Sequence, residues 1–85
     1  MVKYKYNIGQ LFTAGGKEFE IVEAHEDKSF RIVNTAIPSI LISRTEAELS
    51  EAERSGKIQL TFYSMPKIEY CVDLDTKNFY VRKIL

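Results

Sequence analysis

Apolar and polar residues alternate along most of this chain, with the two-residue period of half-buried strands. The first half of the pattern predicts strands at residues 8–12, 17–24, 29–33 and 40–42. Gly15-Gly16 supplies the positive φ that a tight hairpin turn needs between the first two of them. Pro38 cannot donate a ladder hydrogen bond, so we expect residues 34–38 to interrupt the sheet.

The second half of the pattern predicts a strand at 57–62 and a closing hairpin. In the strand at 57–62 we expect the apolar side chains to point inward: Ile58, Leu60 and Phe62. Apolar and polar residues then alternate through 68–74, and the polar loop 75–78 leads into 79–84. This arrangement predicts a hairpin with a four-residue loop.

A single helix is predicted from about Thr45 to Ser55. The run Thr45-Glu46-Ala47-Glu48 fits the capping box, and Gly56 fits the left-handed position that follows a helix. The apolar stripe of this helix is narrow, so the helix can cover the end or edge of a sheet but cannot organise a helical bundle.

These elements favour a mainly β class, α+β by strict count, in one domain over residues 1–85. The preferred architecture is a small, bent antiparallel sheet that closes into a partial barrel of SH3-like type, with the short helix at one end. The alternative is an open antiparallel sheet with the helix on one face.

The composition indicates that the chain can form one hydrophobic core without disulfide bonds or metal ions to stabilise it. The chain has 85 residues, 45% of them hydrophobic, with five Phe and five Tyr. Cys71 is the only cysteine, so no intramolecular disulfide can form, which favours a reducing compartment. No apolar run is long enough to span a membrane, and the first residues lack the apolar run of a signal peptide. We therefore expect a cytoplasmic protein that does not bind membranes.

The charge balance argues against strong non-specific binding to nucleic acid. Twelve basic residues balance twelve acidic ones. The middle of the chain is acidic, since the run from 18 to 27 contains Glu18, Glu20 and Glu23. Two interpretations remain open for this run: a solvated strand edge that charge protects from aggregation, or a face that docks a basic partner.

The N-terminal residues Lys3, Tyr4, Lys5 and Tyr6 alternate as a strand would, with the tyrosines on one face and the lysines on the other. Tyr63, Tyr80 and Arg82 would extend such a surface if the terminal strands are neighbours. The tyrosines either complete the core or form a binding face. A binding face of this kind suits single-stranded nucleic acid, through stacking and charge, and it suits a protein equally well.

No cluster in the sequence predicts catalysis, a cofactor or a metal site. His25 is the only histidine, and its position next to Glu26 and Asp27 predicts a solvated loop residue. Cys71 is expected on the outer face of a strand, with His25 as the only base available to it. Asp and Asn around residues 73–78 are typical turn residues, so hairpin chemistry explains them. We therefore expect a non-enzymatic protein.

The order of strands, turns and helix resembles a known module. The residues that carry the resemblance are Asn7-Ile8-Gly9-Gln10-Leu11-Phe12, Gly16-Lys17-Glu18-Phe19-Glu20-Ile21-Val22, Leu41-Ile42-Ser43, Glu46-Ala47-Glu48-Leu49 and Ser55-Gly56-Lys57-Ile58-Gln59-Leu60. Together they resemble the small SH3-like N-terminal β-barrel of Mu-type transposases and related phage and mobile-element proteins. The resemblance implies an accessory protein of a phage or mobile element that binds a larger protein partner, and no catalytic residue falls within it.

Overall fold

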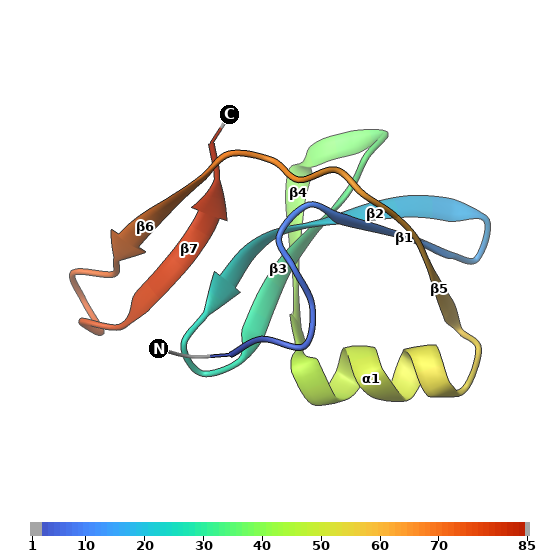
Figure 1. Cartoon of the computed structure of the whole chain (residues 1–85), viewed down its shortest axis with the longest axis horizontal. Helices are drawn as coiled ribbons and strands as arrows, with labels where there is room; N and C mark the ends of the chain where they lie inside the picture. Colours follow the sequence, from blue (N-terminus) through green and yellow to red (C-terminus); the bar gives the residue numbers. More distant parts are fainter. Residues whose placement is uncertain (1–2, 85) are drawn as a thin grey trace.

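A computed structural model describes residues 3–84 of the chain and shows a seven-stranded antiparallel sheet with one helix against a face (Figure 1). The elements are β1 (Gln10–Ala14), β2 (Lys17–His25), β3 (Ser29–Asn34), β4 (Ile37–Thr45), α1 (Glu46–Arg54), β5 (Ile58–Tyr63), β6 (Ile68–Val72) and β7 (Phe79–Lys83).

The long strand β2 organises the sheet, because it pairs with three other strands. One side of β2 pairs with β3 along its length. The other side is shared: Lys17 to Glu20 pair with β1, and Glu23 to His25 pair with β7. A register shift between Ile21 and Glu23 lies between these two stretches and bends the strand. The sheet therefore divides into a body, in the order β4-β3-β2-β1-β5, and a β6–β7 hairpin that projects from it (Figure 1).

The predicted mainly β class is confirmed, and of the two predicted architectures the molecule has the open sheet with the helix on one face. Strands β4 and β5, at the two ends of the body, do not pair with each other, so the sheet does not close into a barrel. The helix α1 follows β4, precedes β5 and contacts both, and it lies across the opening that barrel closure would require (Figure 1).

Both predicted ends of the helix are confirmed. The Thr45 Oγ1 accepts a hydrogen bond from the Glu48 backbone N–H at 3.1 Å, and the Glu48 Oε1 accepts one from the Thr45 N–H at 2.9 Å. These reciprocal bonds satisfy two backbone donors that a helix start otherwise leaves free. They also lower the pKa of the Glu48 carboxyl below its ordinary value. Gly56 follows the helix with a φ of 79°, in the left-handed region.

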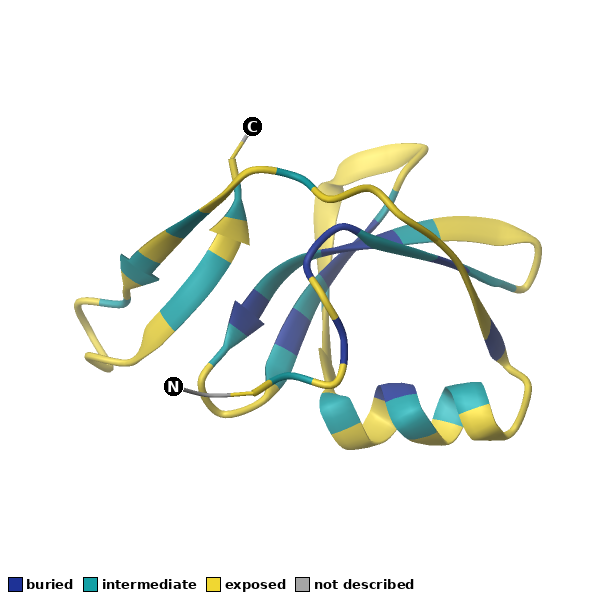
Figure 2. Cartoon of the chain, in the orientation of Figure 1, coloured by how far each residue is buried: buried dark blue, intermediate teal, exposed yellow. Residues whose placement is uncertain are grey.

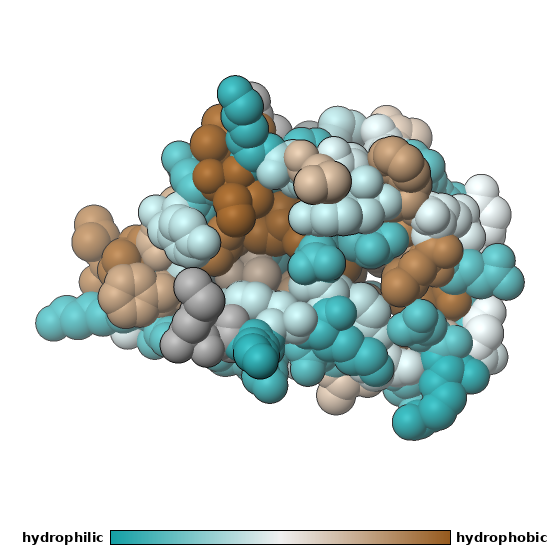
Figure 3. Space-filling model, viewed as in Figure 1, coloured by the Kyte–Doolittle hydropathy of each residue, from teal (hydrophilic) through white to brown (hydrophobic). Residues whose placement is uncertain are grey.

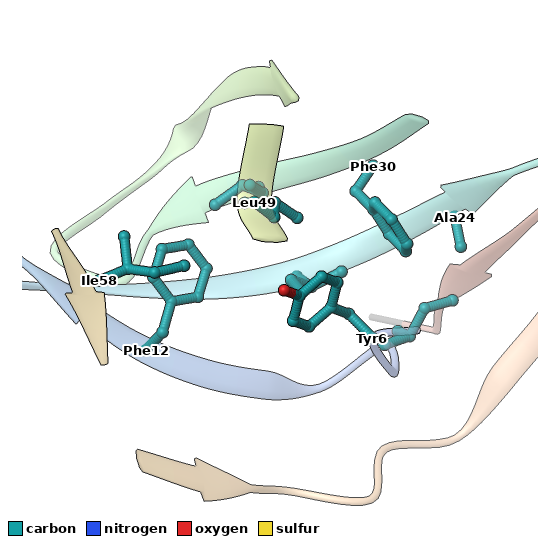
Figure 4. Close-up of a cluster of buried hydrophobic side chains, with 9 residues drawn as sticks. Tyr6, Phe12, Ala24, Phe30, Leu49 and Ile58 are labelled. Atoms are coloured by element: carbon teal, nitrogen blue, oxygen red, sulfur yellow. The ribbon is translucent and has the colours of Figure 1, made fainter. Parts of the chain in front are cut away.

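The core lies in the body, between the bent sheet, the N-terminal segment and α1 (Figure 2). Its buried apolar side chains are Tyr6, Ile8, Phe12, Ile21, Ala24, Phe30, Ile32, Leu49 and Ile58. Figure 4 shows Phe12 and Ile58 at one end of this cluster, Ala24 and Phe30 at the other, and Leu49 of α1 with Tyr6 between them. Leu49 is the buried residue of the helix, so the predicted narrow stripe is confirmed.

Strand β5 differs from its prediction. Ile58 is buried as expected, but Leu60 and Phe62 are exposed, Phe62 to 65% of its surface. The reason is the position of β5 at an edge of the open sheet, where it pairs with β1 alone and α1 lies near its beginning. Strand β4 is longer than predicted, because Pro38 is accommodated as its second residue.

The segment between β5 and β6 is fixed against the N-terminal segment at Gly9. The Gly9 carbonyl accepts bonds from both the backbone N–H and the Oγ of Ser64, each at 3.0 Å. A Cβ at Gly9 would overlap the Cδ of Pro66, and Gly9 has a φ of 93°. A glycine is needed there, and the close approach sets where the hairpin leaves the body.

The predicted closing hairpin is confirmed as β6–β7. The Asp73 N–H donates to the Asn78 carbonyl at 2.9 Å, so the loop comprises residues 74–77, one position earlier than expected. The Asp73 Oδ1 accepts bonds from the backbone of Asp75 and Thr76, which is the turn chemistry that the sequence indicates.

Candidate functional site

The residues Lys3–Tyr6 do not form the predicted strand, although their alternation is real. Lys3 and Lys5 are exposed, whereas Tyr6 is buried and its hydroxyl contacts the helix, donating to Glu53 Oε1 at 3.0 Å. The Tyr4 ring meets the Phe30 ring edge to face, with centroids 5.8 Å apart. Burial is the main cause that raises the pKa of both tyrosines. This segment therefore crosses the core and presents its lysines, not its rings, to solvent.

The acidic run does not form a strand edge, because β2 has neighbours on both sides. Its carboxylates also take separate partners. Glu20 is nearly buried and binds the Lys83 Nζ at 2.9 and 3.1 Å, while the Glu23 Oε1 lies 2.9 Å from the His25 Nε2. Glu18 is exposed and accepts a bond from the Thr35 hydroxyl at 3.0 Å. The run thus makes internal contacts in place of a single acidic face.

His25, Tyr80 and Cys71 lie in one row across three strands, since each is the register partner of the next. The His25 ring stacks on the Tyr80 ring at 4.8 Å, and its side chain is only 18% exposed, so the prediction of a solvated loop histidine is wrong. The Tyr80 ring lies between the imidazole and the Cys71 side chain. A base activates a thiol through a direct hydrogen bond, and this arrangement places a ring between the two groups.

On the same outer face, Arg82 pairs with Glu69 across the β6–β7 ladder. Arg82, one of the candidate contact residues, is therefore tied to a carboxylate within the hairpin. Within residues 3–84 no group of three or more His, Cys, Asp or Glu side chains could hold a metal ion. No helix in that range is long and apolar enough to cross a membrane.

A groove of about 520 Å³ separates the N-terminal segment from the β6–β7 hairpin. Four tyrosine side chains line it, from the N-terminal segment, β5 and β6: Tyr4, Tyr6, Tyr63 and Tyr70. Tyr80 of β7 borders the groove, but its ring lies on the opposite face of the strand, against His25. The other lining residues are mostly apolar, Ile8, Ala24, Pro66, Ile68, Phe79 and Val81, with Asn7 and Glu26 among them. We call this hollow the tyrosine groove.

The rim of the tyrosine groove is open to solvent. Tyr70 is 75% exposed and Phe79 is 62% exposed, and Ile68 beside them is also exposed. Figure 3 shows apolar atoms gathered over the hairpin and against the body beside it. In Figure 2 the hairpin carries no buried residue, unlike the body. Val81 packs against the core, whereas Ile68, Tyr70 and Phe79 on the same face stay exposed in the described part of the chain.

Sequence reasoning identified part of this groove and missed the rest. It singled out Tyr4, Tyr6, Tyr63 and Tyr80 as a possible face, and the structure brings Tyr63 to the groove together with Tyr4 and Tyr6, which pack on its inner wall. The Tyr80 ring lies on the opposite face of β7, against His25. Tyr70 and Phe79 were missed, because their alternation is equally typical of a buried strand face. No local sequence pattern could show that these two side chains are exposed, because their exposure depends on whether another part of the chain packs against them.

A second hollow, of about 590 Å³, lies between α1 and the sheet where β4 and β5 fail to meet. Core residues form its floor, among them Phe12, Leu49 and Ile58. Charged side chains such as Arg44 and Glu48 stand at its border. We interpret this space as the incompletely filled interior of the open sheet.

No family model, no curated protein and no solved structure matches this chain. The resemblance to mobile-element modules therefore stays a prediction.

Proposed function

We propose that this chain is a non-enzymatic interaction module that binds an extended segment of a protein along its hairpin. The observation that carries the proposal is that four tyrosine side chains from distant parts of the chain, Tyr4, Tyr6, Tyr63 and Tyr70, meet at one groove. Tyrosine combines a large apolar ring with a hydroxyl and loses little conformational entropy on binding, which is why it is enriched at protein interfaces.

Two features of the groove suit an extended segment. Its rim residues Ile68 and Tyr70 belong to β6, an edge strand that pairs with β7 alone. A segment added to that edge gains backbone hydrogen bonds and turns alternate side chains toward the groove. The exposed rings of Tyr70 and Phe79 then lose their contact with water, which is the main driving force for such binding.

The alternative ligand, single-stranded nucleic acid, fits the groove less well. Glu26 is the one charged residue among the described residues that line it. Two of the nearby cations are engaged, since Arg82 pairs with Glu69 and Lys83 pairs with Glu20. Binding of a phosphate backbone needs unpaired positive charge, so this chemistry favours protein over nucleic acid. An accessory role in a phage or mobile element is what the resemblance implies.

The test places a photo-reactive amino acid at Tyr70 and, in a control protein, at Ile40 of β4. Ile40 is 57% exposed and apolar but lies away from the groove, so it measures non-specific contact. We expect position 70 to crosslink to one defined protein segment, mapped by mass spectrometry, and we expect Phe79→Ser to abolish this product. Crosslinking from position 70 that is no stronger or more defined than from position 40 would contradict the proposal.

A further inference from the structure

The sheet has three free edges in the described part of the chain, at β4, β5 and β6, and they differ in how they are protected. Strand β4 carries Pro38 and a register shift, and β5 has a register shift against β1. Prolines and bulges discourage pairing between sheet edges. Strand β6 has neither feature, and its ladder with β7 is regular from Ile68 to Val72.

The backbone groups that β6 leaves free can be identified from its ends. The Ile84 N–H donates to the Lys67 carbonyl at 3.0 Å, and the Asp73 N–H donates to the Asn78 carbonyl at 2.9 Å. In an antiparallel ladder the residues that bond to the neighbour alternate with those that point away. Residues 67, 69, 71 and 73 therefore bond to β7. The outward N–H and C=O groups belong to Ile68, Tyr70 and Val72, the residues whose side chains also form the exposed apolar row.

We propose that the segment bound along the hairpin is β6 of a second copy of this chain, paired antiparallel about a two-fold axis at Tyr70. This inference rests on the proposed function and names its partner. Tyr70 pairs with Tyr70 of the second copy, and Ile68 pairs with Val72. Each such pair exchanges both backbone bonds, so the outward groups of the edge are satisfied in one register.

The side chains agree with this register. In it the apolar residues of both copies meet on the groove side of the sheet, and Tyr70 of each copy joins the rim of a continuous apolar strip. At the two ends, exposed Lys67 lies opposite Asp73 of the other copy, so the flanking charges are complementary. A two-fold pairing also uses the β6 edge of both copies and stops at a dimer, because β4 and β5 are protected.

A single added cysteine tests the register. In the proposed dimer, Glu69 lies opposite Cys71 of the other copy as a non-hydrogen-bonded pair, where the Cα separation of about 4.5 Å suits a disulfide. We expect the Glu69→Cys variant to form, under mild oxidation, a disulfide between position 69 of one chain and Cys71 of the other, mapped by mass spectrometry. Wild-type protein should not crosslink, since its Cys71 lies opposite Glu69.

Other products of the same oxidation would overturn the register. One is a main product that joins position 69 to position 69 of the other chain, and another is one that joins the two Cys71 side chains. The absence of any bond between chains would overturn it as well.

Sedimentation of the full chain tests the dimer without a crosslink. We expect monomer and dimer to exchange with concentration, and we expect Val72→Lys to raise the dissociation constant at least about tenfold by placing a charge in the apolar row. Val72 does not line the tyrosine groove, so this variant leaves the groove itself intact. Ile40→Lys on β4 is the matched control and should dimerise as wild type does.

The two proposals fail in different ways. Wild-type protein that stays monomeric at every concentration, or that forms open-ended assemblies, overturns the dimer. If the probe at Tyr70 then crosslinks to a segment of another protein, the proposed function is supported, but its partner is not a second copy of this chain. If that probe reaches no defined segment either, both proposals are wrong.

Discussion

The body and the hairpin of this molecule carry the same sequence pattern and use it differently. Both alternate apolar and polar residues along antiparallel strands. In the body, the apolar face is covered by α1 and the N-terminal segment, and Phe30 is 0% exposed. In the hairpin, the corresponding face carries Tyr70 and Phe79, which are mostly exposed. Alternation predicts that a strand has an apolar face, and only the tertiary arrangement decides whether the chain itself covers that face.

The largest expected effect on stability comes from replacing a phenylalanine in the body, compared with one in the hairpin. Phe30→Ala leaves a cavity in the core and should lower the free energy of unfolding by about 3–5 kcal/mol. Phe79→Ala removes an exposed ring and should cost less than about 1 kcal/mol. Urea unfolding of both variants, in dilute protein, measures the difference. Equal losses would mean that the hairpin face is part of the core and would break the comparison.

The ion pair between Glu20 and Lys83 should give the next largest effect, because it joins the hairpin to the body. Glu20 has a side chain 11% exposed and Lys83 one of 30%, so both are partly desolvated. Lys83→Met leaves the Glu20 carboxylate without its partner and should cost about 1–3 kcal/mol in urea unfolding.

Two further variants separate this pair from a general loss of charge. Lys77→Met in the exposed hairpin loop should change the unfolding free energy little. Adding Glu20→Leu to Lys83→Met should recover part of the loss, because it removes the stranded carboxylate. A double variant that is less stable than Lys83→Met alone would contradict this explanation.

A smaller effect is expected at the start of the helix that covers the body. Thr45→Ala removes the hydroxyl that accepts from the Glu48 N–H and should cost about 1 kcal/mol in the free energy of unfolding. Thr45→Ser keeps the hydroxyl and should stay close to wild type. If alanine and serine destabilise the protein equally, the cap does not contribute as described.

The smallest effect concerns pH, at the turn where β2 leads to β3. Bonds from the Ser29 hydroxyl and backbone N–H to the Asp27 carboxylate lower its pKa below the ordinary value. A group with a depressed folded pKa stabilises the fold above its unfolded pKa, and this stabilisation is lost as pH falls through the folded value. Asp27→Ala should therefore be slightly less stable than wild type near neutral pH.

The two proteins should then converge as pH falls through the depressed pKa of Asp27 and the carboxylate of the wild type becomes protonated. Urea unfolding at neutral and acidic pH measures this convergence. Asp27 is highly exposed, so the difference is small. A gap that widens toward acidic pH would contradict the assigned cause.

Local elements could be predicted from the sequence where a residue type has a backbone consequence. The capping box at Thr45, Gly56 after the helix and the turn at Asp73 are of this kind, and the structure contains all three. The class of the fold follows from them and from the alternation. Closure of the sheet could not be predicted, because it depends on whether β4 and β5 pair with each other. No residue in either strand indicates whether they do.

The candidate site shows the same limit. Tyr4 and Tyr6 could be recognised as a pair on one face, but their position on the inner wall depends on Phe30 and on α1. Tyr70 could not be assigned to a surface, because its pattern also fits a core strand. The tyrosine groove combines residues from both ends of the chain, so it exists only after the hairpin is fixed at Gly9.

The central claim is that the hairpin presents its face and its edge for assembly, and amide hydrogen exchange along β6 tests it most directly. In dilute protein we expect the N–H groups of Ile68, Tyr70 and Val72 to exchange rapidly, since they point away from β7. Those of Glu69 and Cys71 should be protected by their bonds to β7. At high protein concentration the three outward amides should become protected as well. Outward amides that are already protected in dilute protein, or that exchange equally fast at every concentration, would contradict the claim.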